Sequence, residues 1–347
     1  MTKNPVAAQE AVDFTTPMGV GAMSVRPEGM RNDLTSMLMP FFPEDPGLRE
    51  YSATIDGYSV AIYSDHPDYP IATAGDRRVL NYLAGILATS IRTGAPPTRT
   101  LNIELRGLLE TMASDAVIAN GIGGSEYQRV ISRLNRLMAT VIETEMPIAD
   151  DVRRRRRFSW IDGYEHDDQI APGGRKILRL SVRLSEEAFF WLTRSLGFDV
   201  SHREFQHLTA GRSSLWRIFE ICLARLIQNN GDDVRISLAE LRDRVPIASE
   251  LKIFKNRTLR NAMEGVAASK EMSKRLSLSL ERRTEQGFEP VQPRKRTPLD
   301  TLYVRVSRGA APLPAAAPLI NDAPEIPTPT LDTALGPDDH QRSLPMD

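Results

Sequence analysis

The chain has 347 residues, of which 41% are hydrophobic and 26% charged, with a formal net charge of −1. This length and composition indicate a soluble globular protein of about two domains, and no apolar run reaches the roughly 18 residues that a membrane-spanning helix needs. The single cysteine, Cys222, excludes an internal disulfide and a cysteine-based zinc site.

Charge is distributed unevenly along the chain. Residues 1–30, which lack apolar periodicity, and residues 309–347, which are rich in proline and acids, are predicted to be disordered arms. Together they carry a net charge of −6, which leaves residues 31–308 at +5. A modestly basic core is compatible with nucleic acid. The N-terminus has no basic-then-apolar signal, so we expect a cytoplasmic protein.

The first half of the chain is predicted to begin with a hairpin whose turn is Asp56–Gly57. Helices are then expected over Asp76–Ile91, Glu104–Met112 and Ser125–Met138, with a short strand over Thr98–Ile103 and Ser125 as an N-cap. Two further strands, Val141–Met146 and Phe158–Glu165, are expected to pair with each other.

The second half repeats this order of elements with little shared sequence. Ser237 and Glu240 form a capping box at the start of a helix that Pro246 ends. The other predicted elements are a helix over Leu215–Leu226, a strand over Val234–Ile236, a helix over Leu251–Val266, and strands over Leu276–Leu280 and Leu302–Val306. The sequence therefore predicts an α+β chain whose two units share one architecture.

The helix Ser125–Met138 is expected to present basic and amide side chains opposite an apolar stripe that covers an arc of about 120°. Arginine can donate two hydrogen bonds to guanine, and asparagine or glutamine can pair with adenine. The alternative is an exposed amphipathic helix with no special role. The candidate DNA-binding residues of this helix are Ser125, Gln128, Arg129, Ser132, Arg133, Asn135 and Arg136.

The helix Leu251–Val266 has a similar but less regular pattern, because Glu264 shares its outer face. Two lysines at its start are expected to meet a phosphate together with the helix N-terminal amides. The candidate DNA-binding residues here are Lys252, Lys255, Asn256, Arg257, Arg260 and Asn261.

Five consecutive arginines lie at the expected tip between the strands Val141–Met146 and Phe158–Glu165. In a winged helix this position is the wing, which commonly contacts the phosphate backbone or the minor groove. The alternative is a solvated or disordered basic loop. The candidates are Arg153, Arg154, Arg155, Arg156 and Arg157.

A set of short motifs runs in order through approximately residues 31 to 285. The motifs are Arg31-Asn32-Asp33-Leu34, Pro40-Phe41-Phe42, Glu126-Tyr127-Gln128-Arg129 with Leu134 and Leu137, Phe158-Ser159-Trp160-Ile161-Asp162-Gly163-Tyr164-Glu165, Phe205, Leu208, Arg217-Ile218-Phe219-Glu220, Leu251-Lys252-Ile253-Phe254-Lys255 and Leu259-Arg260. This collinear order resembles the plasmid replication initiator protein A family. One position departs from the pattern, because Lys255 follows Phe254 where the family usually has arginine after the aromatic residue.

The resemblance implies two tandem winged-helix domains, placed here at residues 31–183 and 184–308, that bind repeated sequences (iterons) in the double-stranded DNA of a plasmid origin. It also implies melting of adjacent AT-rich DNA and recruitment of the host replicative helicase or its loader. A homodimer that represses its own gene is a further implication, and so is association with the plasmid or nucleoid in the cytoplasm.

Three rival functions can be compared with the proposed one by the features that each would require. The first is a transcriptional repressor with the same fold, which would bind a lone inverted repeat rather than direct repeats. The second is a metal-dependent nicking enzyme, but the spacing of His202 and His207 does not suit its metal site. The third is an ATP-driven initiator, which would need a phosphate-binding loop that the sequence lacks. We therefore expect no catalytic residue, no metal and no cofactor.

Overall fold

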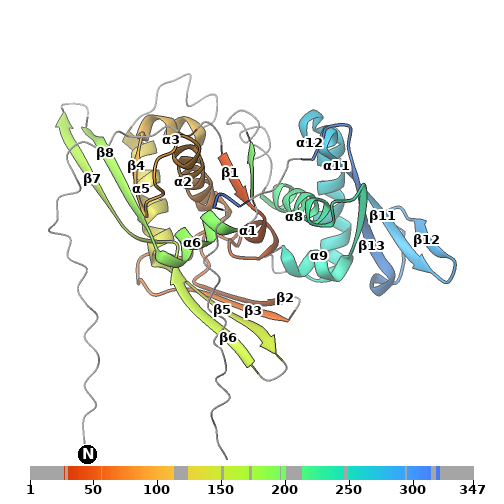
Figure 1. The fold of residues 1–347 in the computed structure, drawn as a ribbon. Helices are drawn as coiled ribbons and strands as arrows, with labels where there is room; N and C mark the ends of the chain where they lie inside the picture. Colours follow the sequence, from red (N-terminus) through yellow and green to blue (C-terminus); the bar gives the residue numbers. More distant parts are fainter. Residues whose placement is uncertain are drawn as a thin grey trace, which may run out of the picture.

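The computed structural model describes residues 27, 30–55, 57–112, 124–149, 152–171, 174–195, 197–200, 213–245, 249–293, 295–313 and 318–320 (Figure 1). The fold mixes helices and sheets, as predicted. Most of both predicted arms, residues 1–26 and 321–347, lies outside the described residues, and so do His202 and His207. In the part of the chain that the structure describes, no helix is long and apolar enough to cross a membrane.

The N-terminal half contains most of the strands, arranged around one long helix, α2, that is buried along most of its length. Its elements are β1 (Met30–Asp33), α1 (Leu34–Leu38), β2 (Glu50–Ile55), β3 (Tyr58–Ser64), α2 (Ala74–Arg92), β4 (Thr100–Ile103), α3 (Leu105–Met112), α5 (Gly124–Ala139), β5 (Thr140–Ala149), β6 (Val152–Ser159), β7 (Ile161–Ala171), β8 (Gly174–Leu184), α6 (Glu186–Arg194) and β9 (Gly197–Val200).

The C-terminal half is built around α8, whose apolar face includes the fully buried Cys222. Its elements are α8 (Ser213–Asn229), β10 (Asp233–Ser237), α9 (Leu238–Arg244), α10 (Leu251–Ile253), the π-helix η1 (Phe254–Leu259), α11 (Arg260–Ala268), α12 (Lys270–Arg275), β11 (Leu276–Thr284), β12 (Gly287–Pro290), the 3-10 helix η2 (Leu299–Thr301) and β13 (Leu302–Arg308).

Several local predictions are confirmed. The β2–β3 hairpin pairs Ile55 with Tyr58, and Gly57 adopts φ = 80°, a left-handed conformation that glycine tolerates best. The Ser237 hydroxyl accepts a hydrogen bond from the Glu240 amide at the start of α9. Local side-chain chemistry therefore sets these element boundaries.

Both halves contain a sheet with the same strand order. In the N-terminal half the order is β4-β8-β7, and in the C-terminal half it is β10-β13-β11 with β12 added at the edge. In the N-terminal half, β8 is the central strand and pairs with β4 on one side and β7 on the other. In the C-terminal half, β13 is flanked in the same way by β10 and β11. This shared order is the physical basis for treating the halves as two copies of one architecture.

The N-terminal half has an additional sheet, in which β5 and β6 extend the β2–β3 hairpin in the order β2-β3-β5-β6. The predicted pairing of Val141–Met146 with Phe158–Glu165 is confirmed only where Val141 and Ile142 pair with Ser159 and Phe158. The rest of it is wrong, because Glu143–Met146 pairs with Arg154–Arg157 and Ile161–Glu165 pairs with β8. The chain changes sheets at Trp160, which is buried and stacks on Phe42 with 5.0 Å between ring centroids. The alternation of apolar residues shifts at this point, because Trp160 and Ile161 are adjacent and both buried.

A short segment at the start of the described chain connects the two halves. β1 pairs with β9, and α1 packs against α8 of the C-terminal half. Arg217 Nη2 donates to the carbonyl of Met39 at 2.6 Å, and Arg244 Nη1 donates to that of Leu38 at 3.2 Å. Burial lowers the pKa of Arg217 to about 10. These hydrogen bonds satisfy carbonyls at the end of α1 that the helix itself leaves free.

α6 and β9 lie with the N-terminal half rather than with the C-terminal half. α6 packs against α2 and β6, and Arg156 of β6 forms a 2.9 Å ion pair with Glu187 of α6. Residues 186–200 therefore contact the unit that precedes them in the chain.

Candidate nucleic-acid interface

Helix α5 is surrounded by other elements along much of its length. It packs against α2, α3, β5, β6, β7 and β8. Its apolar stripe is buried as predicted, with Val130, Leu134 and Leu137 fully covered. The polar face is expected to be open to solvent, and on this point the structure differs from the sequence prediction.

Three polar side chains of α5 make internal contacts. Arg136 forms two hydrogen bonds with the buried carboxylate of Asp76 in α2, at 2.9 and 2.6 Å. Arg133 donates to the carbonyl of Gly75 at 2.9 Å. Asn135 donates to the Tyr69 hydroxyl at 2.8 Å and accepts from a second tyrosine, Tyr164. The expected outward orientation is therefore wrong for Arg133, Asn135 and Arg136.

The electrostatics of these two arginines differ. Burial lowers the pKa of Arg133, whereas the hydrogen bond to Asp76 raises the pKa of Arg136. Asp76 also accepts hydrogen bonds from the backbone and the hydroxyl of Thr73 and so caps the start of α2. Arg136 thus connects α5 to the capped end of α2 through a carboxylate that is only 1% exposed.

The remaining open surface of α5 is a narrow stripe on its N-terminal part. Ser125, Gln128 and Arg129 are exposed, and Ser132 is half-buried. Glu126 forms an ion pair with Arg129, so an acid borders this polar face. Among the candidate DNA-binding residues of α5, these four remain open to a ligand.

The five arginines form strand β6 rather than a loop tip. Because side chains alternate across a strand, Arg153, Arg155 and Arg157 lie on one face and are exposed, while Arg154 and Arg156 are half-buried on the other. Strand alternation therefore divides the run into two differently exposed sets.

The exposed set is opposed by glutamates on the neighbouring strand. Glu145 of β5 lies 3.0 Å from Arg153 and 2.8 Å from Arg155, while Glu143 lies 3.6 Å from Arg157. Burial alone would raise the pKa of Glu145, but hydrogen bonds from Arg153 and Arg155 hold it below its usual value. Three arginines and two glutamates leave one positive charge on this face.

The β7–β8 hairpin, and not the hairpin that carries the arginines, forms the three-stranded sheet of the N-terminal half together with β4. This hairpin belongs to the sheet that corresponds to β10-β13-β11, whereas β5 and β6 belong to the additional sheet. The prediction that Arg153–Arg157 lie at the tip of a wing hairpin is therefore corrected, because these residues form β6 of the additional sheet.

The second candidate helix runs from Leu251 to Ala268 and is interrupted by η1. In an α-helix, residues five apart are turned by about 140° relative to each other, yet Phe254 and Leu259 are both fully buried. The wider π-helical turn brings both onto the buried side. Such π-helical segments occur frequently at functional sites.

The outer face of this helix is open to solvent, unlike the corresponding face of α5. Lys252, Asn256 and Arg257 are exposed, and Asn261 is half-buried. Arg260 is half-buried and lies 3.6 Å from Glu264. The outward residues therefore combine two cations with amides, a combination that suits phosphate and base edges.

Lys255 does not lie on that outer face. Its side chain is buried, and its ammonium donates to the carbonyl of Lys295 at 3.1 Å, in the loop between β12 and η2. Burial lowers its pKa, and the nearby Lys252 lowers it further. The expected phosphate contact of Lys255 is therefore corrected to a structural contact that holds this loop against the helix. Lys295 and Arg296 of the loop are exposed, and the sequence analysis does not identify them.

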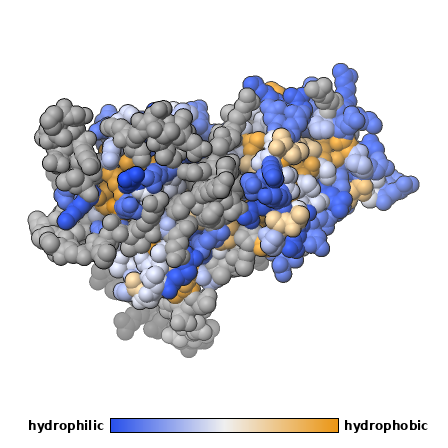
Figure 2. Space-filling model, turned by 90° about the horizontal axis from the view of Figure 1, so that it is seen from above, coloured by the Kyte–Doolittle hydropathy of each residue, from blue (hydrophilic) through white to orange (hydrophobic). Residues whose placement is uncertain are grey.

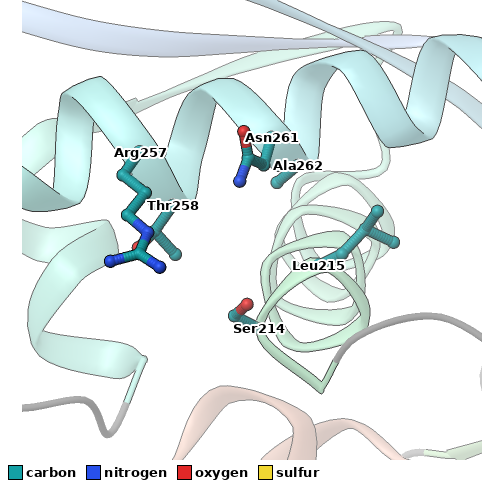
Figure 3. Close-up of a pocket in the computed structure, with 6 residues that line it drawn as sticks. All are labelled: Ser214, Leu215, Arg257, Thr258, Asn261 and Ala262. Carbon is teal, nitrogen blue, oxygen red and sulfur yellow. The ribbon is translucent and has the colours of Figure 1, made fainter.

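A groove of about 440 Å³ lies between this helix and the start of α8. Figure 3 shows Arg257 and Asn261 extending from one side toward Ser214 on the other. The lining residues are Ser214, Leu215, Arg257, Thr258, Asn261 and Ala262. A guanidinium beside hydroxyl and amide groups is suited to a phosphate oxygen. The approach of the helices depends on Gly265, where a Cβ would overlap the side chain of Leu215.

The far end of the C-terminal half is hydrophilic but balanced in charge. Figure 2 shows hydrophilic residues over the end where β11 and β12 lie. On this sheet the arginines are paired with acids, at 2.8 to 3.0 Å, in the pairs Arg235–Glu281, Arg305–Asp233 and Arg282–Glu289. On the helix Leu251–Ala268 and its neighbouring loop, by contrast, cations outnumber acids.

The described residues contain no group of three or more His, Cys, Asp or Glu side chains arranged to hold a metal ion. The expectation of a site without metal or cofactor concerns the whole chain and stays a prediction.

Comparisons with known proteins complete the description of this surface. A family model described as replication initiator protein A matches residues 31–265. The fold is similar to a crystal structure of selenomethionine derivatives of domains 2 and 3 of RctB, with a TM-score of 0.50 and 10% identity, over 80% of this chain and 99% of that chain. A second crystal structure of RctB domains 2–3 has a TM-score of 0.43 and 11% identity, over 80% and 96% of the two chains. The comparison with curated proteins gives no match.

Proposed function

Because the chain belongs to the replication initiator protein A family, we propose that it initiates plasmid replication by binding origin repeats through two winged-helix domains. The observation that carries this proposal is the repeated strand order, β4-β8-β7 and β10-β13-β11, combined with an exposed polar helix face in the C-terminal half. In a helix-turn-helix module the second helix lies in the major groove.

The C-terminal helix Leu251–Ala268 is the principal reading element in this proposal. Asn256 and Arg257 face the base edges, and Lys252 meets the phosphate backbone near the helix start. The exposed Lys295 and Arg296 add positive charge beside this helix.

The N-terminal domain binds a second segment of the duplex through a smaller surface. Ser125, Gln128, Arg129 and Ser132 remain available at the N-terminal part of α5, the part of a recognition helix that commonly contacts bases. Arg133, Asn135 and Arg136 support the position of α5 instead.

The proposal extends to the downstream partners that the sequence resemblance implies. In this proposal the chain recruits the host replicative helicase or its loader, and a homodimer binds the operator of its own gene. It acts without catalysis and in the cytoplasm, associated with its plasmid. The alternative is a repressor of the same fold that has no initiation activity.

Footprinting on the DNA that flanks the gene tests the binding step. The proposal predicts several protected direct repeats at a regular spacing, whereas a single protected inverted repeat favours the repressor. A replication assay then tests initiation, using a plasmid whose only origin is this flanking DNA. Failure of the wild-type protein to maintain that plasmid contradicts the initiator assignment, even where footprinting succeeds.

A further inference from the structure

An exposed aliphatic side chain lies in the middle of the polar helix face. Ile253 is 50% exposed, although most large aliphatic side chains of the described chain are covered. Its exposed neighbours are Lys252, Asn256 and Arg257. An isoleucine that is open to water loses the stabilisation that burial would provide, so a contact in the bound state is the simplest use of it.

The position of Ile253 relative to the polar residues is fixed by helix geometry. Arg257 follows it by four positions, which is close to one turn of the π-helical segment η1, and Asn256 lies beside Arg257; all three side chains are exposed. Lys252, the preceding residue, is near the helix start, where the phosphate backbone is expected. A groove that receives Asn256 and Arg257 therefore also receives Ile253.

The major groove offers one apolar group to such a side chain. Thymine carries a C5-methyl group on its major-groove edge, while the other exposed groups on that edge of the base pairs are hydrogen-bond donors and acceptors. Asparagine suits adenine N6 and N7. An isoleucine beside an asparagine therefore matches a sequence that contains A·T pairs.

We propose that Ile253 is a specificity-determining residue that packs on the C5-methyl group of a thymine in the recognised site. This inference deepens the proposed function and rests on it, because it requires the helix Leu251–Ala268 to enter the major groove. It adds a preference for thymine over a base that lacks only the methyl group.

The test uses the full chain and duplexes that the wild-type protein enriches from a random-sequence DNA library. Each thymine of an enriched duplex is replaced in turn by deoxyuridine, which removes the methyl group and keeps every hydrogen-bonding atom. At one position we expect the affinity of the wild type to fall about fourfold, the value that corresponds to one buried methyl group.

The variants separate a methyl contact from other roles of the side chain. Ile253→Ala is expected to bind the thymine duplex about as weakly as the wild type binds the deoxyuridine duplex, and to show no difference between the two. Ile253→Val keeps a branched side chain and should retain most of the difference. Val152→Ala is the matched control, because Val152 is 53% exposed on β6 and should leave the difference unchanged.

Two results overturn the proposal. One is equal wild-type affinity for thymine and deoxyuridine duplexes at every position, and the other is an Ile253→Ala variant that still discriminates at the same position. The Arg257→Ala variant shows whether such a result refutes only the role of Ile253 or also the proposed function of this helix. Weakened binding by Arg257→Ala together with insensitivity to the methyl group refutes the role of Ile253 alone. If no duplex is enriched, or if Arg257→Ala binds as tightly as the wild type, the proposed use of this helix fails as well.

Discussion

The two candidate reading helices have similar residue types but opposite environments. In α5 the C-terminal arginines face inward and bind Asp76 and the carbonyl of Gly75. In the helix Leu251–Ala268, Arg257 faces outward at the edge of a groove. The difference teaches that the composition of a helix face does not determine its role, because a buried carboxylate on a neighbouring helix converts a potential DNA contact into a structural ion pair.

Arg136→Ala is expected to produce the largest change in stability, because it leaves a buried carboxylate with fewer partners. Removing one member of a buried ion pair typically costs about 3–5 kcal/mol, so the free energy of unfolding measured in urea should fall by about this amount. Unchanged stability together with lost DNA binding would reverse our assignment and return Arg136 to the DNA surface.

Leu134→Ala and Leu259→Ala test whether the apolar stripes of the two helices are equivalent. Both leucines are fully buried, and each truncation should lower the free energy of unfolding by about 2–5 kcal/mol through lost contacts and a cavity. The measurement is denaturant unfolding of both variants under the same conditions. A marked loss in only one of them would show that the two helices are packed to different degrees.

Arg257→Ala is expected to weaken specific DNA binding by about 1–3 kcal/mol with little change in stability. Binding titrations on enriched and random duplexes measure the specific and the non-specific affinity. The matched control is Arg305→Ala, because Arg305 is also exposed but lies on β13 and is paired with Asp233 at 3.0 Å. Comparable losses for the two variants would mean that general charge, rather than the position of Arg257, controls binding.

The arginines of β6 are expected to produce the smallest change. Exposed ion pairs typically contribute about 0–1 kcal/mol each, so replacing Arg153, Arg155 and Arg157 by alanine should barely alter stability. If this face meets phosphates, the slope of log K for DNA binding against log salt concentration should change by about one unit rather than about three. The reason is that two glutamates already neutralise two of the three arginines. A change of about three units would indicate that the ion pairs open when DNA binds.

Local signals in the sequence predict much of the fold. The hairpin at Asp56–Gly57, the cap at Ser237 and the apolar stripes of the helices depend on residues that are close in the chain. The sheet change at Trp160 leaves one local signal, because Trp160 and Ile161 are adjacent apolar residues that are both buried and interrupt the alternation. The predicted strand Phe158–Glu165 runs through this interruption as one continuous strand. The partners of the strands, which are distant in sequence, separate β6 from β7.

The sequence predicts which residue types the candidate surface contains, but not whether each side chain points toward solvent or into the protein. The partner of Arg136 is sixty residues away, and that of Lys255 is forty residues away, so neither contact leaves a local signal. Ile253 is different, since its spacing from Asn256 and Arg257 places it on their face of the helix. A helical wheel that includes apolar residues on the polar face would have identified it.

Chemical modification of arginines, with and without enriched DNA, tests the central claim most directly. An arginine-selective reagent followed by peptide mass spectrometry reports the reactivity of each guanidinium. We predict that Arg257 reacts in the free protein and is protected by DNA, while Arg136 is unreactive in both states because it is bound to Asp76. The opposite pattern, with Arg136 reactive and then protected and Arg257 unaffected by DNA, would contradict the assignment of reading to the C-terminal helix.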